Sequence, residues 1–119
     1  MEAIGLDVVK KQIEYYSMPN GRIPFLEWFQ TLKENHVRAV VDNRLNRVRA
    51  GNLGNCEAVG LGVFELKIHL GPGHRIYFSQ IGHQVVLLLT GGDKASQRKD
   101  IAKAQEYWAE YQGRPYEIV

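Results

Sequence analysis

The sequence contains little cysteine and no long hydrophobic run. Its one cysteine, Cys56, cannot form an intramolecular disulfide and has no second cysteine with which to build a zinc site. The longest apolar run, residues 85–89, is far shorter than the roughly 20 residues that a membrane-spanning helix needs. The first residues, MEAIG, lack the basic and then apolar segments of a signal peptide. We therefore expect a cytoplasmic protein with no membrane partner.

The sequence also lacks a strong charge of one sign. Its 15 Lys and Arg residues stand against 13 Asp and Glu residues, which gives a formal net charge of +2. So small a surplus does not by itself indicate a nucleic-acid-binding protein, and the positions of the basic residues must decide. With 119 residues, of which 45% are hydrophobic, the chain is expected to form one folded domain over residues 1–119.

The hydrophobic patterns predict a strand, two helices, three strands and a last helix. Residues 8–16 are rich in β-branched and aromatic side chains, which favours a strand. Pro24 suits the first position of a short apolar helix that continues to Leu32. A second helix is predicted over residues 36–50, because Gly51 is typical of the residue that follows a helix. The Gly- and Asn-rich residues 51–62 are predicted to form a surface loop.

Arg44 occupies an unusual position in the second predicted helix. Its place in the helical repeat puts it inside the apolar stripe between Val37 and Val40. We expect its guanidinium either to reach solvent past its aliphatic stem or to meet a carboxylate from another element. With Arg47 and Arg49 it is a candidate for binding a nucleic-acid backbone, although an ordinary solvent-facing side is the simpler interpretation.

Residues 63–80 alternate between apolar and polar side chains on either side of the turn Gly71-Pro72-Gly73, which predicts a hairpin. Pairing Leu70 with His74 aligns the apolar residues, and a slip of one residue would bury charged side chains. On the polar face this register sets side chains about 5 Å apart. The predicted pairs are His69 with Arg75, Lys67 with Tyr77, and Glu65 with Ser79.

The side chains of this polar face suit metal-free phosphodiester chemistry. Lys67 and Arg75 could hold a phosphate and its developing negative charge, while Glu65, His69 or Tyr77 could move protons. The simpler interpretation is the solvated outer face of an antiparallel sheet, where mixed charges are common.

The next strand has no alternation, since its apolar run VVLLL predicts a position near the centre of the sheet with both faces covered. A final helix is predicted over about residues 95–112, capped by Asp93 or Ser96. Lys94, Arg98 and Lys99 surround the start of this helix, a position that attracts phosphate, although a solvated basic first turn explains them equally well. The histidines lie on separate predicted elements without ligand spacing, so we expect no metal and no cofactor.

Two strings of the sequence, ELKIHLGPGHRIYF and LLLTGGDK, resemble a known family. They are similar to the small toxins of type II toxin–antitoxin modules of the RelE/ParE superfamily, and most similar to the HigB-like addiction module killer proteins. The similarity extends from Ile13 through Trp28 to the final helix, which is nearly the whole chain. It implies an α+β fold: a twisted, mostly antiparallel four-stranded sheet in the order β-α-α-β-β-β-α, packed by helices on one face.

The resemblance also implies a function. Toxins of this kind are neutralised by an antitoxin, typically a helix-turn-helix DNA-binding protein from the adjacent gene, through which the toxin contacts DNA only indirectly. RelE-like members cut mRNA on the ribosome without a metal ion and use basic residues of the sheet. Arg75, Lys67 and Lys94 match such basic positions, whereas the C-terminal tyrosine has no clean counterpart because Tyr107 lies within the final helix. The proton-transfer group is therefore left open.

Two other functions are compatible with the same resemblance. ParE-like members share the fold and poison DNA gyrase by binding it, without catalysis. A degenerate toxin would keep only the ability to bind its antitoxin and help repress their promoter. The basic and titratable side chains of the predicted hairpin favour the endoribonuclease.

Overall fold

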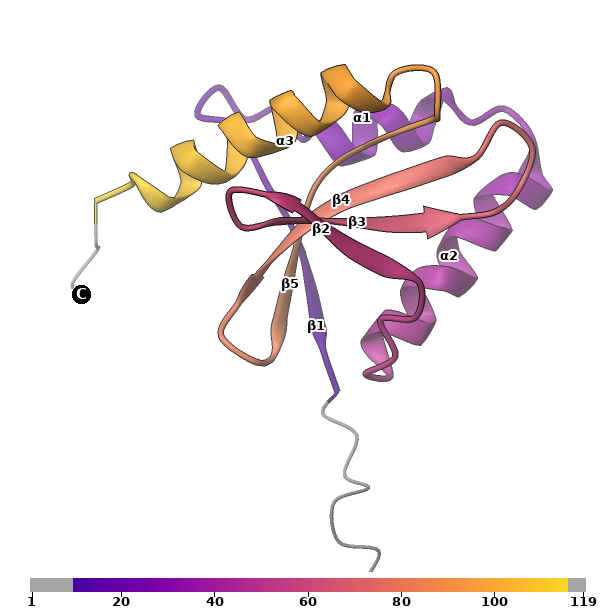
Figure 1. The fold of residues 1–119 in the computed structure, drawn as a ribbon, viewed down its shortest axis with the longest axis horizontal. Coiled ribbons are helices and arrows are strands. Elements are labelled where there is room, and N and C mark those ends of the chain that lie inside the picture. Colours follow the sequence, from indigo (N-terminus) through magenta and orange to yellow (C-terminus); the bar gives the residue numbers. More distant parts are fainter. Residues whose placement is uncertain (1–9, 116–119) are drawn as a thin grey trace, which may run out of the picture.

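The computed structural model describes residues 10–115, which form an α+β fold with a five-stranded mixed sheet and three helices (Figure 1). The elements are β1 (Gln12–Tyr15), α1 (Pro24–Thr31), α2 (Asn35–Arg49), β2 (Cys56–Gly60), β3 (Val63–Ile68), β4 (His74–Ile81), β5 (Val85–Gly92) and α3 (Gln97–Gln112). The first two residues of the predicted first strand, residues 8–9, lie outside the described part. No helix within residues 10–115 has the length and apolar character that crossing a bilayer requires.

The strands lie in the order β1-β5-β4-β3-β2, so β5 and β4 are interior strands. β1 pairs with β5 in parallel, while the other three pairs are antiparallel. The prediction that the VVLLL strand lies near the centre with both faces covered is confirmed, because residues 86–92 of β5 are all buried. The sheet is therefore mostly antiparallel, as expected, with one parallel pair at an edge.

The prediction of four strands is wrong, because β2 lies within the stretch predicted to be a loop. Among the strands within residues 10–115, β2 is a short edge strand that pairs with β3 alone, so its side chains show little of the burial pattern that identifies a strand. The turn into β3 uses left-handed backbone at Gly60, Leu61 and Gly62, with φ of 99°, 55° and 84°. The glycines of this stretch correctly predicted a turn. Because they made the whole stretch resemble a loop, β2, which precedes the turn, was not predicted.

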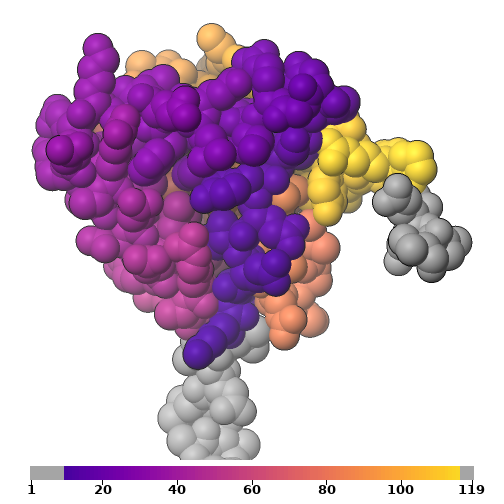
Figure 2. All heavy atoms as spheres, turned by 180° about the vertical axis from the view of Figure 1, so that it is seen from behind, coloured from indigo at the N-terminus to yellow at the C-terminus, as the bar shows by residue number. Residues whose placement is uncertain are grey.

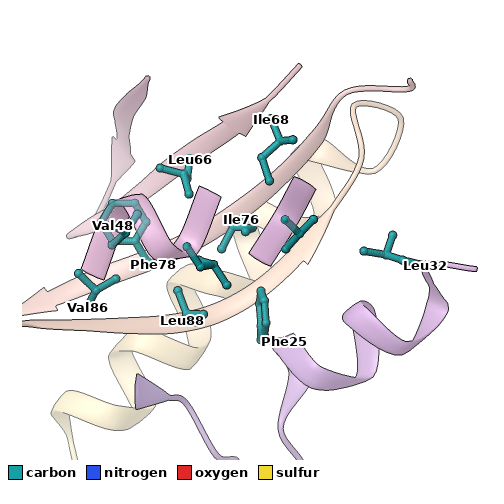
Figure 3. Close-up of a cluster of buried hydrophobic side chains, with 11 residues drawn as sticks. Phe25, Leu32, Val48, Leu66, Ile68, Ile76, Phe78, Val86 and Leu88 are labelled. Carbon is teal, nitrogen blue, oxygen red and sulfur yellow. The ribbon is translucent and has the colours of Figure 1, made fainter. Parts of the chain in front are cut away.

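The first core lies between one face of the sheet and the helices α1 and α2. In Figure 3 the side chains of Leu66, Ile76 and Phe78 point from the sheet toward these helices, which contribute Phe25 and Val48. Seen from behind in Figure 2, the indigo-to-purple segment that includes α1 spreads over the upper part of this side. This core follows the apolar alternation of the hairpin, as the sequence predicted.

The second core lies on the opposite face of the sheet, under α3. It contains Val63, Tyr77, Leu87 and Leu89 from the strands and Ala104 from α3. The prediction that helices cover only one face is therefore wrong. The physical reason is that β5 presents apolar side chains on both faces, so each face buries more area when a helix covers it.

Candidate active site

The hairpin β3–β4 places its polar side chains in a register that differs from the predicted one by two residues. Lys67 lies opposite Arg75 and Glu65 lies opposite Tyr77, while Ile68 rather than Leu70 pairs with His74. The predicted pairs of His69 with Arg75, Lys67 with Tyr77 and Glu65 with Ser79 are therefore wrong.

The turn explains this shift. The connection comprises residues 69–73 and is closed by a hydrogen bond from the Gly73 amide to the Leu70 carbonyl, 3.1 Å long, with left-handed backbone at Gly71 and Gly73. A shift of two residues leaves every side chain on the same face, because side chains alternate with a period of two. The apolar pattern excludes a slip of one residue, and it does not distinguish registers that differ by two.

The polar face of the hairpin is only partly open to solvent. Glu65, Tyr77 and Ser79 are each 0% exposed, because α3 packs over this part of the sheet. The prediction that these three side chains lie on a solvated face is therefore wrong. Lys67 and Arg75 lie nearer the turn and remain partly exposed, with side-chain exposures of 27% and 13%.

Glu65 is the centre of a buried hydrogen-bond network. The Tyr77 hydroxyl donates to Glu65 Oε2 at 3.0 Å, and Nε2 of Gln97 donates to the same oxygen at 2.8 Å. Nε of Arg75 lies 3.5 Å from this oxygen, so the carboxyl also faces a cation. Burial, followed by the hydrogen bond to Glu65, raises the pKa of the Tyr77 hydroxyl well above its usual value. Tyr77 therefore remains protonated at neutral pH and acts as a donor to Glu65.

Three cations gather beside this network, at the turn end of the hairpin. Lys67 and Arg75 are cross-strand partners. Nη1 of Arg75 donates to the Gly73 carbonyl at 2.7 Å, and a Cβ built on Gly73 would lie 3.9 Å from the Cβ of Lys94. We call Lys67, Arg75 and Lys94 the cation cluster. Positive groups held in fixed positions can stabilise the negative charge that develops on a phosphate during its reactions.

Two residues of this region were not predicted from the sequence. Glu57 on β2 forms an ion pair with Lys67, with Oε1 and Nζ 2.5 Å apart, and this contact lowers the pKa of the Glu57 carboxyl. Glu57 was missed because it lies in the stretch predicted to be a loop. Gln97 was missed because only the packing of α3 brings it to Glu65, and the sequence signal was limited to its place in the first turn of a helix.

His69 lies apart from the Glu65 network. It falls in the turn rather than in β3, its side chain is exposed, and its Nε2 lies 2.8 Å from Nδ2 of Asn55. Among the three proton-transfer candidates on the predicted polar face, it is the one that is open to solvent, since Glu65 and Tyr77 are buried.

The predicted RNA-binding residues do not form one surface. Arg47 and Arg49 are exposed in the last turn of α2, whereas Arg98 and Lys99 are exposed in the first turn of α3, on the other side of the sheet. Arg44 is only 4% exposed and donates through Nη2 to the Leu53 carbonyl. Both expectations for Arg44, solvent or a carboxylate, are wrong, because a backbone carbonyl of the segment after α2 binds it instead.

The site has no group of metal ligands of the kind that common protein metal sites use. Within the described residues 10–115, no three His, Cys, Asp or Glu side chains are grouped so that they could hold a metal ion. The site therefore contains two charged features: a buried carboxyl that forms an ion pair with Arg75, and the cation cluster beside it.

The chain was compared with known proteins. No protein-family model matches the sequence. Over 83 residues the chain is 39% identical to an uncharacterized protein of Haemophilus influenzae, and the match covers 70% of this chain and 84% of that protein. The chain belongs to the same family as this Haemophilus protein. The relationship to this uncharacterized protein does not indicate an activity, so a functional proposal depends on the geometry of the site.

Proposed function

We propose that the protein is the toxin of a bacterial type II toxin–antitoxin module, a HigB-like member of the RelE/ParE superfamily with a RelE-like sheet, and that it cleaves mRNA on ribosomes without a metal ion. The observation that supports this proposal most strongly is the cation cluster. Lys67 and Arg75 on adjacent strands and Lys94, in the segment between β5 and α3, lie beside the turn of the hairpin. These are the three basic positions that the resemblance singles out.

The proposed reaction uses the 2′-hydroxyl of the RNA as nucleophile. Its oxygen attacks the adjacent phosphorus, the bond from phosphorus to the 5′-oxygen of the next nucleotide breaks, and the products are a 2′,3′-cyclic phosphate and a 5′-hydroxyl. The 2′-hydroxyl loses a proton and the leaving oxygen gains one, so the reaction is balanced without any further reactant. The cation cluster stabilises the additional negative charge on the phosphorane.

The buried residues have a positioning role in this mechanism. Glu65 holds Arg75 through their 3.5 Å contact, and Tyr77 and Gln97 hold Glu65 by hydrogen bonds. His69, which is exposed, is the proposed acceptor of the 2′-hydroxyl proton. The proposed partners are mRNA, the ribosome and a cognate antitoxin, the last of which would cover the cation cluster.

One observation favours a second candidate function, a ParE-like gyrase poison. Two of the three predicted proton-transfer groups, Glu65 and Tyr77, are buried in a hydrogen-bonded network. A protein that acts by binding gyrase needs a charged surface and no accessible acid or base, so the same structure suits it.

The test combines induced expression with analysis of the RNA ends. Growth arrest with loss of translation and mRNA fragments supports the ribonuclease, whereas DNA damage with trapped gyrase supports the second candidate. The chemistry is then tested with ribosomes programmed with defined mRNA, in buffer whose Mg²⁺ serves the ribosome. Fragments with a 5′-phosphate, or cleavage of an mRNA that carries a 2′-deoxy nucleotide at the cut site, would contradict the proposed reaction.

A further inference from the structure

A second basic feature lies on the α2 side of the sheet, separate from the Glu65 network. A pocket of about 370 Å³ is lined by α2, by residues 54–55 and by the end of β3. Its polar lining residues are Arg44, Arg47, Asn55, Lys67 and His69. None of its lining residues, all within the described part of the chain, is an Asp or a Glu. We call it the Arg44 pocket.

Arg44 is buried in this pocket, and one of its hydrogen-bond donors has no partner among residues 10–115. It is 4% exposed, and its Nη2 donates to the Leu53 carbonyl. Its Nη1 is buried and has no hydrogen-bond partner among residues 10–115, and Arg44 takes part in no ion pair there. The guanidinium packs against Gly54, where a Cβ would lie 3.0 Å from Cζ. A buried donor without a partner is unfavourable, so the position favours an acceptor that arrives from outside.

The charge of the pocket favours an anion. Burial and the neighbouring charge of Arg47 lower the pKa of Arg44, yet an arginine in a protein keeps its charge at neutral pH. Arg47 is exposed on the same helix and forms no ion pair within residues 10–115, so two cations face the pocket without a carboxylate. Lys67 also lines the pocket, but its ammonium is paired with Glu57.

We propose that the Arg44 pocket binds a phosphate group, supplied by one nucleotide of a single-stranded RNA. The planar guanidinium of arginine matches phosphate oxygens, and Asn55 provides a further polar group in the lining of the pocket. The volume falls in the range of sites for small ligands, so the sugar of the nucleotide also fits. The choice of RNA rests on the proposed function.

The position of the pocket explains how it would serve a ribonuclease. Lys67 lines the pocket and is also the cross-strand partner of Arg75 in the cation cluster. A strand that runs across β3 at Lys67 would place one phosphate at the cation cluster and a neighbouring nucleotide in the Arg44 pocket. The pocket is therefore a subsite that fixes the register of the RNA relative to the reacting phosphate.

Binding is tested directly by NMR on the protein with labelled arginine side chains. The two probes are inorganic phosphate and a short 2′-O-methyl RNA, which has no free 2′-hydroxyl and is not cleaved by the proposed reaction. We expect a saturable shift of the Arg44 Nε–H resonance with each probe, and we expect the RNA to displace phosphate. If phosphate shifts the Arg44 resonance and the RNA does not displace it, the pocket binds phosphate but RNA is not what supplies the phosphate group, and this part of the proposal is overturned. No saturable shift of Arg44 with either probe would overturn the proposal, and an acidic peptide that alone shifts it would assign the pocket to a protein partner.

Variants give a second, independent readout. Arg47→Ala changes an exposed residue, and Arg44→Lys keeps the charge but loses the planar fork. We expect each variant to weaken RNA binding. The logarithm of the RNA association constant decreases linearly with the logarithm of the salt concentration. In Arg47→Ala this slope should become less steep by about 0.7, because the variant neutralises one phosphate fewer. Lys103→Ala, which removes an exposed charge on α3, is the matched control and keeps the wild-type slope. Wild-type RNA affinity and slope in Arg47→Ala, together with wild-type affinity in Arg44→Lys, would overturn the proposal.

The two proposals can fail separately. The NMR titration measures binding by the isolated protein and needs no toxicity. If Arg44 binds phosphate while induction causes neither growth arrest nor mRNA fragments, the proposed ribonuclease is wrong and the phosphate site stands. If mRNA is cleaved while Arg44 responds to neither probe, the ribonuclease stands and the subsite is wrong.

Discussion

Glu65 Oε2 lies within 3.5 Å of donor atoms from three side chains, those of Tyr77, Gln97 and Arg75. Glu65 is 0% exposed, so the loss of any of these donors leaves a buried carboxyl with fewer polar partners and lowers the stability of the fold. Lys67, by contrast, is paired with Glu57, whose side chain is 58% exposed. Substitutions of the two hairpin cations should therefore have different effects on stability even if both cations contact the same phosphate.

We predict that Lys67→Ala abolishes toxicity while leaving the fold stable. A surface ion pair contributes about 0–1 kcal/mol, so the free energy of unfolding should change little. Removal of one charge-assisted hydrogen bond to the transition state should lower the cleavage rate about 10²–10³-fold. Cleavage rates at equal folded concentration and urea unfolding measure the two quantities. Glu57→Ala, which removes the same ion pair and keeps the cation, is the matched control and should still cleave RNA.

We predict that Arg75→Ala lowers both activity and stability. It removes the cation that faces Glu65, and breaking a buried ion pair by removing one partner costs about 3–5 kcal/mol. The 13% exposure of Arg75 places the expected loss at the lower end of this range. Urea unfolding measures the loss, and the cleavage rate is compared per folded molecule. Wild-type rates in both Lys67→Ala and Arg75→Ala would show that the hairpin cations are not the site.

Tyr77→Phe separates a positioning role from a role in proton transfer. The ring stays in the core, and Glu65 loses one of its two hydrogen-bond donors, which should cost about 1–3 kcal/mol of unfolding free energy. Since the Tyr77 hydroxyl stays protonated and buried, we expect the pH profile of cleavage to keep its shape and the rate to fall by less than about tenfold. A fall of about 10²–10⁴-fold with a changed pH profile would identify Tyr77 as a general acid.

The C-terminal part of α3 is attached to the segment that follows β1. The Tyr16 hydroxyl donates to Glu110 at 2.6 Å, and the ring of Tyr16 stacks on Tyr107 with centroids 5.1 Å apart. Arg114 completes the attachment by donating to Glu110 and to the Ser17 carbonyl. Because β1 is the parallel edge strand, these interactions join the first strand to the last helix.

This attachment predicts a loss of stability at high pH. Burial, and then the hydrogen bond and charge of Glu110, raise the pKa of Tyr16 from 10.0 to about 12. A raised pKa in the folded state means that the contribution is complete below pH 10 and is lost as the pH rises from 10 toward 12. The contribution is at most about 2–3 kcal/mol, and solvent screening reduces it because the partners Glu110 and Arg114 are 34% and 37% exposed. Tyr16→Phe should therefore show a smaller decrease in unfolding free energy than the wild type over this range.

Urea unfolding at several pH values between about 9 and 12 measures this difference. The Tyr77 hydroxyl, whose pKa is also raised, is present in both proteins, so its effect cancels in the comparison. Equal decreases for the wild type and Tyr16→Phe would show that the Tyr16–Glu110 hydrogen bond does not stabilise the docking of α3.

At the scale of the whole molecule, helices cover both faces of the sheet and leave the turn end of the hairpin open. α1 and α2 pack on one face and α3 packs on the other, while Lys67 and Arg75 stay partly exposed beside the turn and Lys94 is exposed. We therefore expect the proposed antitoxin to cover this end, with an acidic or apolar segment in extended or helical form.

We predict that the proposed antitoxin, sought in the adjacent gene, protects Lys67 and Lys94 from chemical acetylation in the complex. Lys103 on α3 is exposed and lies outside the cation cluster, so it serves as the internal control and should stay reactive. Mass spectrometry of the modified free protein and complex gives the extent of reaction at each lysine. Equal reactivity of Lys67 and Lys94 in both states would show that inhibition does not act by covering the cation cluster.

The sequence by itself determined the positions of the helices and of most strands, and the faces of the strands β3 and β4. Pro24 and Gly51 marked a helix start and a helix end within one residue or so, because these residues restrict the backbone locally. The alternation within β3 and β4 assigned the side chains of these strands to a face, and the VVLLL run predicted a strand buried on both faces, because both are local patterns of period and composition.

Only the tertiary structure decided the pairing and the burial of the site. The predicted register of the hairpin was wrong by two residues, because side chains two residues apart point to the same face and the apolar pattern fits both registers. The edge strand β2 was not predicted, because it has a single neighbouring strand and its side chains are little buried. Which polar residues are covered depended on where α3 packs, and the partner of Arg44 depended on the path of residues 51–55. These are interactions between distant segments, and their energies depend on geometry that no local pattern contains.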